Sequence, residues 1–131
     1  REHRLGHVHG AHGSYQIFPG DPRKVRIPDV SFIRAERLPA GGPSKGHSRT
    51  VPDLVVKVIS PNDEAAELFA KLEDYHVVGV PLLWVVDPGT RTVRIERGDG
   101  TTFRLTTADT IDAEPVLPGF RCPVRLFFES A

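Results

Sequence analysis

Residues 53–87 decide the fold of this 131-residue chain, and they read DLVVKVISPNDEAAELFAKLEDYHVVGVPLLWVVD. The stretch opens with residues 53–59, which are apolar on both faces except at Lys57. It closes with a second apolar run, residues 80–87. Such runs are typical of strands buried on two sides in an α/β sheet. Two of them flanking a helix predict a parallel pair joined by a right-handed crossover.

The segment between the two strands predicts a helix over residues 62–78. Ser60 is the expected N-cap, and Pro61 has the fixed φ that suits the first helical position. Gly79 is expected to terminate the helix, because glycine readily adopts the left-handed conformation found there. Apolar residues at i, i+4 and i+7 form a stripe that should be buried: Leu68, Leu72 and Tyr75.

Two further strands are predicted ahead of this central unit, over residues 14–18 and 25–33. The second of them carries Pro28 and Asp29 in its middle. Because proline lacks the N–H that a sheet ladder needs, this strand should lie at an edge or contain a bulge.

A hairpin is predicted after the central unit. Thr92–Arg97 alternates apolar and charged residues, and a Gly-Asp-Gly turn leads to a partner strand over residues 101–106. This pattern favours two antiparallel strands with one exposed face. The tail, residues 111–128, predicts a loop with a short edge element.

These elements predict an α/β or α+β fold in which one main helix packs on a mixed β-sheet. Residues 1–131 should form a single domain, because this length leaves no room for two independent cores. Within the domain we expect an irregular segment over residues 1–13 and a long loop over residues 39–52.

Composition narrows the class of protein. The chain is 39% hydrophobic and 26% charged, which is ordinary for a soluble domain with a packed core. No run approaches the roughly 18 apolar residues of a membrane span, so we expect a cytoplasmic protein without a membrane partner. The single cysteine, Cys122, excludes an internal disulfide framework and a multi-thiolate zinc site. Glycine-rich phosphate loops and the GxSxG and HExxH motifs are absent as well.

Charge is distributed unevenly along the chain. Residues 1–57 hold 10 Lys and Arg against 5 Asp and Glu, a net charge of 10 − 5 = +5. Residues 58–131 hold 7 against 12, a net charge of 7 − 12 = −5. This asymmetry allows a basic face for a polyanion. The basic group formed by Arg23, Lys24 and Arg26 is either a track for DNA phosphates or an ordinary solvated face.

Three charged residues lie where a buried sheet rarely tolerates charge. Asp29 follows a proline at a strand break, Lys57 interrupts the most apolar run, and Lys71 borders the buried helix stripe. Each has a purely structural alternative. Asp29 could form a turn hydrogen bond, Lys57 could extend its ammonium to solvent, and Lys71 could pair with Glu67 one helical turn away.

A series of short motifs resembles a known family. In chain order they are PDVSFI at 28–33, VPDLVV at 51–56, VISPND at 58–63, Lys71, Tyr75, GVP at 79–81, WVVDP at 84–88 and LPGF at 117–120. Over residues 16–128 this order resembles the Uma-type restriction endonucleases, a bacterial family of the PD-(D/E)XK nuclease superfamily.

The resemblance implies a restriction-endonuclease-like fold whose N-terminal helical part is short or missing in this chain. It also implies hydrolysis of DNA phosphodiesters with Mg²⁺ or Mn²⁺. By the resemblance, Asp29 is a metal ligand and Lys71 is the catalytic lysine. The family's second acid falls on position 57, where this chain has Lys57.

The lysine at position 57 departs from the family pattern. Mg²⁺ requires hard oxygen ligands and commonly takes one or two carboxylates. A lysine removes one carboxylate and brings a cation to the expected place of the metal. We therefore expect weak metal binding and impaired cleavage, unless Asp53 or Glu67 substitutes for the missing acid. The alternative is a degenerate nuclease fold that binds DNA or a protein without cleaving, and the expected assembly is a homodimer.

Overall fold

The structure is a computed structural model that describes residues 6–10, 13–40 and 46–129. Its centre is the predicted strand–helix–strand unit, formed by β3 (Leu54–Val58), α2 (Ala65–Val77) and β4 (Leu82–Asp87). The strands β3 and β4 pair in parallel, with Leu54 opposite Leu82. The parallel pair predicted from the apolar runs is therefore confirmed.

The remaining strands extend this pair into a six-stranded mixed sheet with the order β1-β2-β3-β4-β5-β6. Every other pairing in the sheet is antiparallel, including the predicted hairpin of β5 and β6. The four additional strands are β1 (Gly6–His9), β2 (Val30–Arg34), β5 (Thr92–Arg97) and β6 (Thr102–Leu105).

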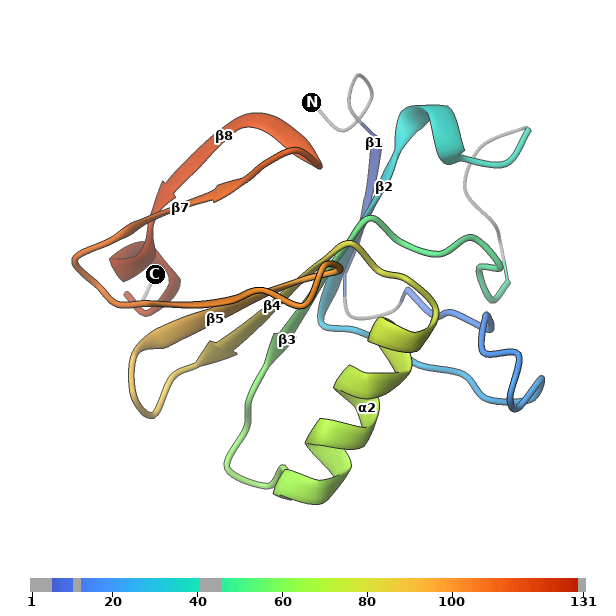
Figure 1. The fold of residues 1–131 in the computed structure, drawn as a ribbon, viewed down its shortest axis with the longest axis horizontal. Coiled ribbons are helices and arrows are strands. Elements are labelled where there is room, and N and C mark those ends of the chain that lie inside the picture. Colours follow the sequence, from blue (N-terminus) through green and yellow to red (C-terminus); the bar gives the residue numbers. More distant parts are fainter. Residues whose placement is uncertain (1–5, 11–12, 41–45, 130–131) are drawn as a thin grey trace.

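The sheet is covered on both faces (Figure 1). On one face, Val55 of β3 packs with the helix stripe Leu68, Leu72 and Tyr75, which is buried as predicted. On the other face, Val56 and Trp84 belong to a separate apolar cluster. This division follows from the strand geometry, because successive side chains point to opposite faces of a sheet.

The C-terminal tail differs from the prediction. It forms a second, two-stranded sheet of β7 (Thr110–Ala113) and β8 (Leu117–Pro123), followed by the short 3₁₀ helix η2 (Val124–Phe127). Ile111 and Ala113 are fully buried in the cluster on the face opposite α2. The tail, predicted as a loop with one edge element, is therefore a hairpin that covers the cluster on this face of the sheet. The hairpin was difficult to predict, because the alternation of buried and polar residues in β7 spans only three positions.

Strand boundaries near the N-terminus also differ from the prediction. Residues 14–18 contribute only isolated bridges, from Tyr15 to Arg26 and to Ser48. The strand predicted at 25–33 begins at Val30, after Pro28. Part of the segment expected to be irregular, residues 1–13, forms β1 on the edge of the sheet. Of the expected long loop at 39–52, residues 41–45 lie outside the described residues.

The start of the helix is a further correction. α2 begins at Ala65 with Glu64 as its N-cap, so Ser60 does not cap it and Pro61 is not its first residue. Instead, the Asp63 carboxylate accepts the Ser60 N–H at 2.7 Å, which closes a separate turn before the helix. Gly79 follows the helix at φ +88°, as predicted for a terminating glycine.

The fold class is α+β, with one α-helix in the described part of the chain. No helix precedes β2 within the described ranges. No helix among the described residues combines the length and the apolar character needed to span a membrane.

Candidate functional site

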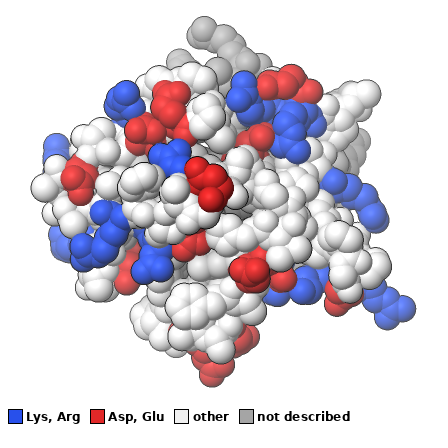
Figure 2. Space-filling view, in the orientation of Figure 1, with Lys and Arg blue, Asp and Glu red and all other residues white. Residues whose placement is uncertain are grey.

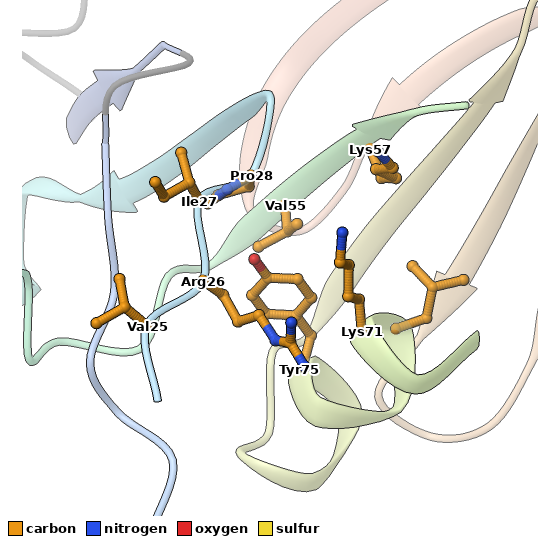
Figure 3. Close-up of a pocket in the computed structure, with 9 residues that line it drawn as sticks. Val25, Arg26, Ile27, Pro28, Val55, Lys57, Lys71 and Tyr75 are labelled. Atoms are coloured by element: carbon orange, nitrogen blue, oxygen red, sulfur yellow. The ribbon is translucent and has the colours of Figure 1, made fainter. Parts of the chain in front are cut away.

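A cavity of about 220 Å³ lies between α2, β3 and the segment that leads into β2 (Figure 3). Apolar side chains form most of its wall, and three basic side chains and one phenol also reach it. Its lining residues are Val25, Arg26, Ile27, Pro28, Val55, Lys57, Lys71, Leu72 and Tyr75.

Asp29 follows Pro28 at the edge of this cavity, and its carboxylate binds the backbone of β3. Its Oδ2 accepts the N–H of Val58 at 2.6 Å. Val30 pairs with Val56, so continuing this antiparallel register by one residue places Asp29 opposite Lys57. The turn hydrogen bond considered from sequence is thus a bond across strands, and it holds the acid beside the C-terminal end of β3.

Lys57 is the charged side chain of that strand end. It points to the helix side of the sheet, two residues after Val55, and its Nζ lies 3.3 Å from Oδ2 of Asp63. Both side chains are about one-fifth exposed. The Ser60 N–H, together with the Lys57 ammonium, holds the pKa of Asp63 below its usual range. The cation at position 57 is therefore neutralised by an acid from the turn that precedes α2.

The pairing with Asp63 was missed by sequence reasoning, which assigned this residue to the helix terminus. The signal available in the sequence is an acid six residues after Lys57, within a Ser-Pro-Asn-Asp turn. The pairing depends on how that turn folds back over the strand end, and this turn is not part of the helix.

Lys71 and Tyr75 reach the cavity from α2, one helical turn apart. In Figure 3 both side chains extend from the helix toward β3. Among the described residues, Lys71 has no ion-pair partner, so the alternative pairing with Glu67 is not seen; Glu67 itself is exposed on α2. Tyr75 is only 4% exposed, and burial raises the pKa of its hydroxyl well above the ordinary value.

Asp53, one of the two substitute acids considered from sequence, lies at the opposite end of β3. Its carboxylate accepts the Arg34 N–H at 2.8 Å and is 2.9 Å from Nη1 of Arg37. Lys57 lies four residues further along the chain, a span of about 13 Å in an extended strand. Its oxygens are thus engaged away from the cavity.

The basic group Arg23, Lys24 and Arg26 is divided by the fold. Arg26 and Lys24 contact one carboxylate, that of Asp74, at 2.6 and 3.2 Å, whereas Arg23 is exposed. Burial alone would raise the pKa of Asp74, but hydrogen bonds from Arg26 and Lys24 outweigh it and hold the pKa below its usual range. On the face shown in Figure 2, basic and acidic side chains are interspersed.

The residues around the cavity do not fit a divalent metal. Within the described ranges, no three His, Cys, Asp or Glu side chains come close enough together to hold an ion. Asp29 is the acid beside the cavity, and the Lys57 ammonium lies on the next strand and already pairs with Asp63. A cation so placed opposes the binding of Mg²⁺, which needs carboxylate and other oxygen ligands.

Comparison with known proteins places this fold and this order of residues in one family. The model of the family described as "Uma2: Putative restriction endonuclease" matches residues 1–125. The chain belongs to the Uma2 family. The family expected from the motif order is thereby confirmed.

The fold of this Uma2 chain is also found in a solved structure, that of a putative nuclease belonging to DUF820 from Anabaena variabilis. The two share a TM-score of 0.81 at 17% identity, over 96% of this chain and 69% of the other. At this identity the likeness shows the fold alone. A search of curated proteins finds no match to the Uma2 chain.

Proposed function

We propose that this Uma2 domain is directed to DNA, that its metal-dependent cleavage is strongly impaired, and that its cavity binds a backbone phosphate. One observation carries the proposal. At the position that the resemblance gives to the family's second acid, Lys57 pairs with Asp63 at 3.3 Å. The pair replaces a metal-binding carboxylate with a neutralised cation.

Electrostatics favours an anion at this cavity over a divalent cation. Arg26, Lys57 and Lys71 line it, and Lys71 has no carboxylate partner among the described residues. Phosphate oxygens accept charge-assisted hydrogen bonds from lysine, whereas the unpaired Lys71 ammonium would repel Mg²⁺. A phosphodiester is the anion that a nuclease family implies.

A second candidate is an active Mg²⁺-dependent endonuclease of the PD-(D/E)XK type. Asp29 and Lys71, the acid and lysine that the resemblance implies, lie at the same cavity or at its edge. In an intact site a bound metal would lower the pKa of water for attack on phosphorus. This candidate requires a second carboxylate, besides that of Asp29, that substitutes for the acid missing at position 57. DNA as substrate and a homodimer as assembly stay predictions for both candidates.

Cleavage and binding separate the two candidates. We expect the chain to bind DNA in EDTA and to leave supercoiled plasmid intact in Mg²⁺ or Mn²⁺. The control is Asp29→Ala, which removes the implied metal ligand. Nicking by the unmodified chain that disappears in Asp29→Ala would contradict the proposal and establish the second candidate. Nicking that persists in the control would indicate a contaminating nuclease.

The substitution Lys57→Glu tests the same observation directly. It supplies the family's acid, so we expect Mn²⁺ binding to appear in calorimetry where the unmodified chain shows little. The matched control is Lys57→Gln, which removes the cation without adding a carboxylate and should bind Mn²⁺ no better than the unmodified chain. Identical titrations of Lys57→Glu and Lys57→Gln would show that position 57 is not at the metal site.

A further inference from the structure

Tyr75 brings a phenol hydroxyl to the wall of the cavity. The residue is 4% exposed, and no hydrogen bond to its hydroxyl is found among the described residues. Its ring is held by α2 and by an edge-on contact with Phe18, with centroids 6.1 Å apart. Because its oxygen opens to the cavity, the hydroxyl can donate a hydrogen bond to a ligand that carries an acceptor.

Lys71 stands beside it as a second donor, and it has no ion-pair partner within the described ranges. Residues four apart on a helix lie on the same face, and Figure 3 shows both side chains directed toward β3. The other two basic side chains of the cavity differ from Lys71, because Arg26 is paired with Asp74 and Lys57 with Asp63. The cavity therefore offers an unneutralised ammonium and a neutral hydroxyl at adjacent positions.

We propose that Tyr75 and Lys71 together bind one phosphate group of the DNA backbone, with Lys71 supplying charge and Tyr75 a neutral hydrogen bond. This inference rests on the proposed function and adds a residue to it. Neither the motif order nor the position of the implied metal assigns a role to the Tyr75 hydroxyl.

The buried Tyr75 phenol carries its proton and can therefore donate a hydrogen bond. Burial raises the pKa of Tyr75 and outweighs the opposing effect of the nearby Arg26 cation, so the phenol stays protonated near neutral pH. Two carboxylates lie near Tyr75, and both are engaged: Asp74 pairs with Arg26 and Lys24, and Oδ2 of Asp29 accepts the Val58 N–H. Phosphodiester oxygens can accept from both donors at once.

The test measures the affinity of a short fluorescent DNA duplex in EDTA over a range of salt concentrations. Tyr75→Phe keeps the ring and its packing, and we expect it to weaken DNA binding about tenfold. The salt dependence should stay unchanged, because no charge is lost. Lys71→Gln should weaken binding and also lower the slope of log affinity against log salt by about 0.9. The different slopes distinguish a hydrogen bond from an ion contact.

The second tyrosine provides a matched control. Tyr15→Phe removes a hydroxyl that bonds Ser31 at 2.7 Å and does not line the cavity, so DNA affinity should not change. Thermal unfolding checks that each variant is folded. If the unmodified chain binds DNA and folded Tyr75→Phe binds equally well, the inference is overturned while the proposed function stands.

Inorganic phosphate separates the anion site from the DNA function. If the unmodified chain does not bind DNA, the proposed function fails. In that case phosphate that shifts the NMR signals of the Tyr75 ring and the Lys71 side chain still supports the two-donor site. Unchanged signals at both residues would overturn it.

Discussion

The two ends of β3 carry similar charged groups, but they differ in how many of these groups have an ion-pair partner. At the N-terminal end, Asp53 is 7% exposed and its carboxylate contacts both the Arg34 N–H and the Arg37 guanidinium. At the C-terminal end, Lys57 and Asp63 neutralise each other, but Lys71 on α2 has no ion-pair partner in the described part of the chain. Complete pairing indicates a structural role, whereas donors left unpaired around a cavity indicate binding.

The packing around each end explains the difference. The N-terminal end is closed by β2 and the short 3₁₀ helix η1 (Ala35–Arg37), which brings Arg37 to Asp53. At the other end, the chain leaves β3 through the turn at residues 60–63 and returns as α2. Helix and strand do not close completely there, and the cavity of about 220 Å³ lies between them.

The largest expected effect on stability comes from a substitution at the N-terminal end of β3. Asp53→Ala should lower the free energy of unfolding by about 2–3 kcal/mol, because it leaves the Arg34 N–H unpaired and Arg37 without its acid. Asp63→Ala removes a carboxylate at the other end and should cost clearly less, because solvent screens an ion pair near the surface. Urea denaturation of both variants measures the contrast, and equal losses would contradict the distinction between the two ends.

A smaller effect is expected from the acid that neutralises two cations beside the cavity. The pKa of Asp74 is lower in the folded state than the value of about 3.9 in an unfolded chain. Its contribution to stability is thus fully present above that value and is lost as pH falls through the folded-state pKa.

Asp74→Asn should therefore lower the free energy of unfolding by about 1–2 kcal/mol near neutral pH, because Lys24 and Arg26 lose their shared acid. The difference between the variant and the unmodified chain should shrink below about pH 4. Urea titrations from neutral to acidic pH measure both effects. A difference that is constant across this range would show that the ionised carboxylate is not the cause.

The smallest expected effect on stability is that of Lys71→Gln. Because Lys71 has no ion-pair partner among the described residues, its replacement should change the free energy of unfolding by less than about 0.5 kcal/mol. The same variant should lose DNA affinity. Lys71→Gln would thus affect binding more than stability, whereas the main effect of Asp53→Ala is on stability. Urea denaturation measures the change, and a loss of about 2 kcal/mol or more would mean that Lys71 supports the fold.

The central unit could be predicted because its signals are local. Two apolar runs flank a helix whose buried stripe recurs every turn, and the parallel pairing follows from that order. The hairpin of β5 and β6 has an equally local signal in its alternation and its glycine turn. The hairpin of β7 and β8 was missed, because its burial depends on contacts with residues of β3 and β4 distant in sequence.

The candidate site also has a part that could be predicted from sequence and a part that could not. The position of charges within apolar runs, together with the motif order, singles out Asp29, Lys57 and Lys71, and all three lie at the cavity or at its edge. The partner of Lys57 could not be predicted, because the Asp63 carboxylate reaches it only through a turn that was interpreted as helix. Tyr75 was expected as part of the buried stripe, and its hydroxyl acquires a second role only beside an open cavity.

Residue type and spacing along the chain were enough to predict the strand–helix–strand centre, and the order of short motifs resembled the family that the family model then confirmed. Which charges are neutralised, and which donors remain available, depended on packing in three dimensions. Asp53 and Lys57 are four residues apart in the chain, yet one is engaged by Arg34 and Arg37 and the other lies beside a cavity. Ionic and hydrogen-bond pairing depends on distances between side chains, and only packing sets those distances.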